Sequence, residues 1–200
     1  MRRRLVTETD EHPWLTGAPP ARAAAFNRYV SSRLRLDASM FALSGIELDP
    51  KPSGDTTFRR SYEIHHFDSR LISVEIFTFH ESYFGHGWRS EFGLNWDLAA
   101  GRPVHVVDLF RPGVDWHAVV TARARDWLRE ESDNPGAADY LNDRTLDDNE
   151  SWLFDDDGAV LLLGRGERSM AGDFADVPIP YDVLVPLLRP DPPLPVRQKP

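Results

Sequence analysis

Residues 81–98 read "ESYFGHGWRSEFGLNWDL", and the second half of this stretch alternates strictly between two kinds of side chain. One face carries apolar side chains interrupted only by a serine: Trp88, Ser90, Phe92, Leu94, Trp96 and Leu98. The other face carries polar side chains and one glycine: Arg89, Glu91, Gly93, Asn95 and Asp97. A period of two with one polar face predicts an antiparallel strand that is buried on one side only.

The first half of the stretch predicts a loop. His86 lies between two glycines, which give the backbone the freedom that a turn or bulge requires. The preceding run, residues 71–79, is partly apolar on both faces and predicts a central strand. Residues 80–87 are therefore expected to connect a long hairpin.

Aromatic side chains at a loop tip are typical of protein interfaces, so this loop is one candidate partner-binding surface. Its candidate residues are Tyr83, Phe84, His86 and Trp88. Two alternatives stay open. Trp88 can instead begin the buried face of its strand, and His86 can serve mainly to shape the turn.

Outward from the hairpin, β-patterns and helix patterns are mixed along the chain. Strands are expected over residues 2–9, 57–67 and 104–110, with a further hairpin over 151–163 around an Asp-Gly turn. Helices are expected over residues 20–36, with Ala23, Phe26, Val30 and Leu34 on one face, and 114–131, with Trp116, Val119, Val120, Trp127 and Leu128 on one face. An extended segment entering a short helix is expected over 177–188.

This order predicts an α+β fold in which an antiparallel sheet packs against a few helices. Three parts are expected: a strand-helix subdomain over 1–56, the main α+β domain over 57–188, and a proline-rich tail over 189–200. The tail holds five prolines and is expected to be frayed.

Composition limits the possible partners. The chain has 200 residues, no cysteine, and 32 acidic against 23 basic side chains, which gives a net charge of −9. Nucleic acid and anionic membranes need clustered cations, so neither is expected as a partner. The charge would suit a cationic protein, although many soluble proteins are acidic. No disulfide or thiolate chemistry is possible.

The sequence contains no motif for metal-dependent or covalent catalysis. His80 and His86 are six positions apart, whereas a zincin needs two histidines one helical turn apart. The neighbours His65 and His66 point to opposite faces of a strand and cannot converge. No G-x-S-x-G occurs. We therefore expect neither a metal nor a cofactor, and no catalytic residues.

The order of short motifs resembles one known family. The run 71–110 resembles a strand, a Gly-x-His-Gly loop, a strand ending in aromatic-Asp-Leu and an L-x-D-L-F segment. Residues 154–184 resemble the matching C-terminal half, with an Asp-Gly hairpin, an Ala-Gly loop and a segment entering the last helix. This arrangement is similar to the C-terminal domain of the RsiV anti-sigma factors, which also occurs in some peptidoglycan deacetylases and in a secreted mycobacterial immunogenic protein.

The resemblance implies an α+β fold and a non-catalytic, extracytoplasmic binding role, with lysozyme as the partner in RsiV. Relatives carry proline and tyrosine in the loop after the last hairpin strand, where this chain has "GRGER". The loop's charged residues, Arg165, Glu167 and Arg168, complete the candidate partner-binding set. Its two arginines would repel a basic partner.

We therefore expect a non-catalytic binding domain whose partner is a protein or cell-wall material. Two alternatives remain: a cytosolic immunity or inhibitor protein, and a cell-wall hydrolase that uses His86. The resemblance suggests an extracytoplasmic location, whereas "RRRLVTETDEHPW" (residues 2–14) contains no apolar signal-peptide core and predicts a cytoplasmic one.

Overall fold

The chain forms two compact units, and neither is contiguous in the sequence. The computed structural model describes residues 6–16, 19–43, 56–81, 87–132, 135–163 and 175–196. One unit comprises Met1–Tyr62 with Ile76–Glu91, and the other comprises Glu63–Glu75 with Phe92–Pro200. The division expected from the sequence, with boundaries after residues 56 and 188, stays a prediction.

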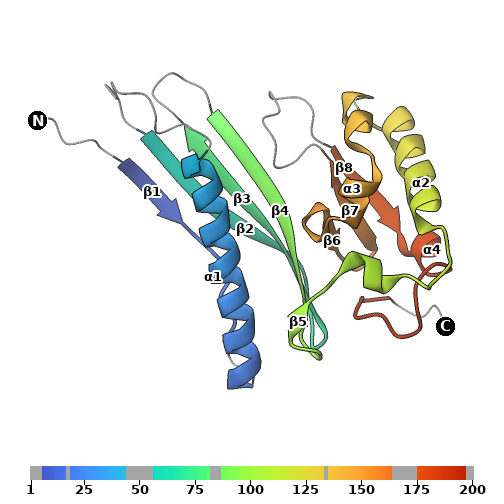
Figure 1. Cartoon of the computed structure of the whole chain (residues 1–200), viewed down its shortest axis with the longest axis horizontal. Helices are drawn as coiled ribbons and strands as arrows, with labels where there is room; N and C mark the ends of the chain where they lie inside the picture. The colour runs from blue at the N-terminus through green and yellow to red at the C-terminus, as the bar shows by residue number, and fades with distance from the viewer. Residues whose placement is uncertain are drawn as a thin grey trace, which may run out of the picture. The chain divides into compact units, whose positions relative to one another are not determined.

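A five-stranded sheet has the strand order β1-β2-β3-β4-β5 (Figure 1). Its strands are β1 (Val6–Asp10), β2 (Thr56–Phe67), β3 (Leu71–Glu81), β4 (Gly87–Asp97) and β5 (Arg102–Pro103). β1 pairs with β2 in parallel, and β4 pairs with β5 in antiparallel register. The central place of β3 confirms what its two apolar faces predicted.

Helix α1 (Pro20–Leu43) belongs to the first unit. Three of the four residues of the expected apolar face are buried, Phe26, Val30 and Leu34, whereas Ala23 is half-buried. These three buried side chains follow one another at spacings of four, so they share one face, and burial of that face explains why this polar-rich sequence forms a stable helix. Arg60 is also buried, and its guanidinium bonds the Asp10 carboxylate at 3.0 Å.

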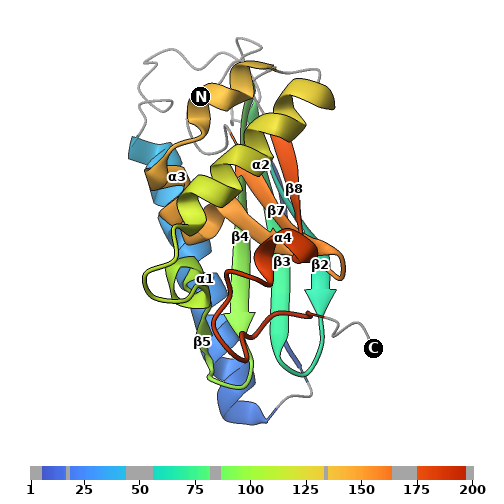
Figure 2. The same cartoon turned by 90° about the vertical axis from the view of Figure 1, so that its right-hand side faces the viewer.

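The second unit contains a three-stranded antiparallel sheet with helix α2 (Trp116–Glu130) lying against it (Figure 2). Its strands are β6 (Trp152–Phe154), β7 (Gly158–Leu163) and β8 (Ala175–Pro180), and α4 (Tyr181–Leu184) follows. This confirms the expected Asp-Gly hairpin and closing helix. Val119 is more exposed than the predicted α2 face required, at 39 %.

A short helical turn replaces a strand that was expected in the middle of the chain. η2 (Val106–Leu109) lies where a strand was expected over 104–110, so that prediction was wrong. Val106 and Leu109, three residues apart, are both buried, and one turn of 3-10 helix places them on the same side. The acidic excursion beyond α2 forms η3 (Pro135–Tyr140), α3 (Asp143–Asp147) and η4 (Asn149–Ser151).

The predicted polar face of β4 was also wrong. Glu91, Gly93 and Asn95 are buried, although their pattern predicted contact with solvent. The Asn95 amide donates to the backbone oxygen of Trp152 at 2.6 Å and accepts from the Ser73 hydroxyl at 2.8 Å. A hydrogen-bonded asparagine costs little to bury, so β4 is covered on both faces in this region.

The expectation of a frayed tail was wrong for residues 189–196. The Arg70 guanidinium contacts the Asp191 carboxylate at 2.9 Å and the Pro192 oxygen at 3.2 Å. Leu194 is buried in the core of the second unit. These contacts hold the segment against the β2–β3 turn. The α+β class expected from the sequence is confirmed.

Candidate functional site

The predicted partner-binding residues cannot be compared with the structure. Tyr83, Phe84 and His86 lie outside the described residues, as do Arg165, Glu167 and Arg168. Trp88 lies in strand β4, but its side chain is outside the described part. Both loops stay predictions.

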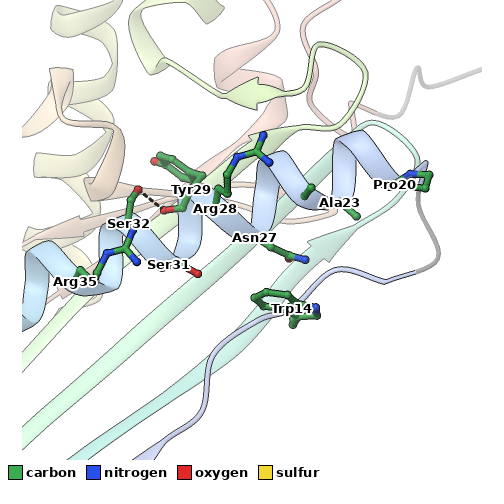
Figure 3. A pocket seen from close by; sticks show the side chains of 10 residues that line it. Trp14, Pro20, Ala23, Asn27, Arg28, Tyr29, Ser31, Ser32 and Arg35 are labelled. Atoms are coloured by element: carbon green, nitrogen blue, oxygen red, sulfur yellow. Dashed lines mark hydrogen bonds between the residues drawn. The ribbon is translucent and has the colours of Figure 1, made fainter.

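The described residues contain a different candidate, a shallow surface groove of about 840 Å³ along helix α1 (Figure 3). All of its residues belong to the first unit. We call it the α1 groove, lined by Trp14, Pro20, Ala23, Ala24, Asn27, Arg28, Tyr29, Ser31, Ser32 and Arg35. Small side chains form much of its floor, and two arginines and an indole supply the larger groups.

Trp14 is held in place although it is exposed. Its side chain is 60 % exposed, the highest value among the large apolar residues described. The next residue, Leu15, is clamped to α1, because the Asn27 amide accepts from the Leu15 N–H at 2.9 Å and donates to the Leu15 oxygen at 3.1 Å. Figure 3 shows the Asn27 side chain pointing toward the indole. This clamp fixes the backbone next to Trp14, and the His12 ring meets the indole edge-on with 6.4 Å between the ring centres.

The α1 groove is cationic within an acidic chain. Residues 20–35 contain four arginines and no acidic residue. The Arg28 side chain is exposed and makes no hydrogen bond or ion pair with another residue in the described part of the chain. Arg28 and Arg35 are seven residues apart, which places them on one helix face about 10 Å apart. Positive charge is therefore concentrated on residues 20–35, and the remaining residues together carry a net charge more negative than −9.

The second unit contains a buried histidine–carboxylate pair. His65 Nε2 lies 3.1 Å from Glu75 Oε2, and the Glu75 side chain is almost fully buried. The hydrogen bond with Glu75 raises the pKa of His65 against the opposing effect of burial. Neither residue lines the α1 groove.

His66 points to a different set of carboxylates, as the alternation of β2 predicted. Its Nδ1 lies 2.9 Å from Asp156 and its Nε2 lies 3.3 Å from Asp68. Burial alone would raise the pKa of Asp68, but hydrogen bonds from the Leu71 and Arg70 N–H groups lower it. Within the described ranges, no three histidine, cysteine or acidic side chains are arranged to hold a metal ion.

The acidic turn Asp155–Asp157 has a local structural role. The Asp155 carboxylate accepts hydrogen bonds from the Asp157 and Gly158 N–H groups, both at 2.8 Å. The Tyr181 hydroxyl donates to the backbone oxygen of Asp155 at 3.2 Å, and burial raises the pKa of this tyrosine. These hydrogen bonds stabilise the turn, and they explain the aspartate at position 155 without a role in binding or catalysis.

Sequence reasoning could have found part of the α1 groove. The apolar face of residues 20–36 was predicted correctly, so Arg28 and Arg35 follow as members of the opposite face. The sequence gives no sign of how Trp14 is oriented, because "HPWLTGAPP" (residues 12–20) is rich in turn-forming residues and has no periodic pattern. The clamp from Asn27 depends on a contact across 12 residues.

No helix in the described part of the chain is both long and apolar enough to cross a membrane.

Comparison with known proteins identifies the fold. No family model and no curated protein matches the sequence. A DUF3298 family protein from Pseudomonas aeruginosa matches with a TM-score of 0.60 and 17 % identity, over 90 % of this chain and 85 % of that one. A DUF3298 family member from Bacteroides fragilis matches with a TM-score of 0.51 and 17 % identity, over 86 % and 71 %. The chain therefore has the α+β fold of the solved DUF3298 family proteins.

Proposed function

We propose that this chain is a non-catalytic binding domain of the RsiV ectodomain type, and that the α1 groove is one of its contact surfaces. The observation that carries the proposal is the exposed Trp14, held beside α1 by Asn27. An exposed aromatic side chain carried on a fixed backbone loses less conformational entropy when a partner covers it than one on a mobile loop. The partner is a protein or cell-wall material.

The residues that line the α1 groove support binding over catalysis. The lining contains no aspartate, glutamate or histidine. Hydrolysis of a glycosidic bond requires paired carboxylates, and general acid–base catalysis near neutral pH most often uses histidine. Arginine, asparagine, serine and tryptophan are groups that recognise a ligand. The loops around residues 81–88 and 164–172 remain a second predicted surface.

The proposal is tested by two binding assays on the purified chain. One assay measures co-sedimentation with purified bacterial cell walls, and the other measures association with immobilised lysozyme by biolayer interferometry. We expect binding in at least one assay, and Trp14→Ala should weaken it at least tenfold. Phe67→Ala is the matched control, because Phe67 is 58 % exposed and does not line the groove.

Thermal melts of Trp14→Ala and Phe67→Ala check that a loss of binding does not arise from unfolding. Exposed side chains contribute little to folding, so both melting temperatures should stay close to that of the wild type. If neither ligand binds, or if Phe67→Ala weakens binding as much as Trp14→Ala, the α1 groove is not the contact surface.

A further inference from the structure

We infer that the α1 groove takes an anionic oligosaccharide, one that carries carboxylates spaced along a chain of sugar rings. This inference rests on the proposed function and names the class of ligand. It starts from the charge of α1, which has four arginines and one aspartate in a chain whose net charge is −9. A local positive field on an acidic protein selects anions and repels cationic proteins from this surface.

The arginines specify the kind of anion. Guanidinium groups bind carboxylates through two parallel hydrogen bonds. Arg28 and Arg35 both line the α1 groove and stand about 10 Å apart along the helix. That distance is about the length of a disaccharide, so a chain with one carboxylate in each disaccharide can meet both arginines at once. A single monosaccharide acid cannot span them.

The rest of the lining favours sugar rings over a peptide. Ala23, Ala24, Ser31 and Ser32 provide a shallow floor without a deep apolar pocket for a peptide's aliphatic or aromatic anchor. Trp14 offers an exposed indole face, against which the C–H groups of a pyranose ring can stack. Ser31 and Tyr29 add hydroxyl groups at the helix surface.

The arrangement also sets a minimum length for the ligand. Figure 3 shows the Trp14 indole on one side of α1 and the Arg28 guanidinium on the other. A ligand that touches both must cross the exposed helix face, and a helix with side chains is about 10 Å wide. An oligosaccharide of several rings meets this requirement.

The test measures the affinity of the full chain by isothermal titration calorimetry for three probes. The probes are a hyaluronan hexasaccharide with three carboxylates, a neutral chitin hexasaccharide, and a peptide with three glutamates. We expect measurable binding of hyaluronan alone, weakened by raising the salt concentration. Arg28→Gln combined with Arg35→Gln should weaken it about tenfold, since each exposed ion pair contributes a few-fold in affinity.

Arg22→Gln is the matched control. Arg22 lies on the same helix, is exposed and carries the same charge, but it does not line the α1 groove. Its affinity for hyaluronan should stay within twofold of the wild type. Circular dichroism checks that all variants are folded.

Three results would overturn the inference. They are equal affinity for the neutral hexasaccharide, tighter binding of the glutamate peptide, and an unchanged affinity in the double arginine variant. The wild-type protein can also fail to bind hyaluronan and still bind cell walls or lysozyme in a manner that depends on Trp14. That result would overturn the class of ligand but not the proposed function. Absence of binding in every assay overturns the proposed function as well.

Discussion

Substituting Gly93 by alanine tests how closely β4 approaches β6. A Cβ at this position would lie 2.0 Å from the backbone oxygen of Trp152 and 3.3 Å from Leu153 Cδ2. The clashing group is backbone, so it cannot rotate away, and the two strands must separate by about 1.4 Å to reach an ordinary van der Waals contact. The same oxygen accepts the 2.6 Å hydrogen bond from Asn95, which this movement would lengthen.

The magnitude follows from these two losses. Overpacking of a close-packed interior costs about 1–3 kcal/mol, and weakening one buried hydrogen bond costs about 0.5–1.5 kcal/mol. Replacing glycine reduces the entropy of the unfolded chain, which offsets about 0.4–1 kcal/mol. The net expectation is a loss of about 2 kcal/mol in the free energy of unfolding.

Guanidinium chloride unfolding followed by circular dichroism measures this loss, with Gly101→Ala as the control. Gly101 has a positive φ of 69° but no atom within 4 Å of an added Cβ. Its substitution should cost only the strain of a left-handed conformation, about 1 kcal/mol. If Gly93→Ala loses no more stability than Gly101→Ala, the close contact between β4 and β6 is not present in solution.

Two further predictions concern single interactions. Because the pKa of His65 is raised, its pairing with Glu75 stabilises the fold fully below about pH 6.5, and this stabilisation is lost as the pH rises through the raised pKa. The concentration of guanidinium chloride that unfolds half of the wild-type protein should therefore be lower at about pH 8.5 than at about pH 6. Glu75→Gln should flatten this fall, and an equally steep fall in that variant would assign it to other groups. Asp115→Ala should lower stability by about 1 kcal/mol, because the Asp115 carboxylate accepts the Ala118 N–H at 3.1 Å at the start of α2. Asp115→Asn should retain most of the stability in the same denaturation assay, and a loss equal to that of alanine would exclude a capping role.

Local patterns predicted the elements whose burial depends on their own residues. The helix α1 face of Phe26 and Val30 and the two apolar faces of β3 both follow from periodicity. The burial of Asn95 could not be predicted, because its partner Trp152 is 57 residues away. The fixed C-terminal segment was missed for the same reason, since Arg70 meets Pro192 across 122 residues. Composition alone made that segment resemble a solvated tail.

The candidate site shows the same limit. The arginines of the α1 groove could be inferred as the complement of a buried helix face. The fixed, exposed Trp14 could not, because a tryptophan in a turn-rich segment is equally consistent with burial. The two loops that sequence reasoning chose lie outside the described residues and remain untested.

The interleaving of the two compact units constrains how such a domain evolves. Each unit is built from two separate stretches of sequence, and the divisions fall inside the strands β2, β3 and β4. Genetic recombination exchanges contiguous segments of a gene. A single crossover within one of these strands would therefore combine part of each unit from one parent protein with the rest of that unit from another. Neither unit can be gained, lost or shuffled between proteins by itself. The two are therefore expected to be inherited together, and to diversify by point substitution and loop changes.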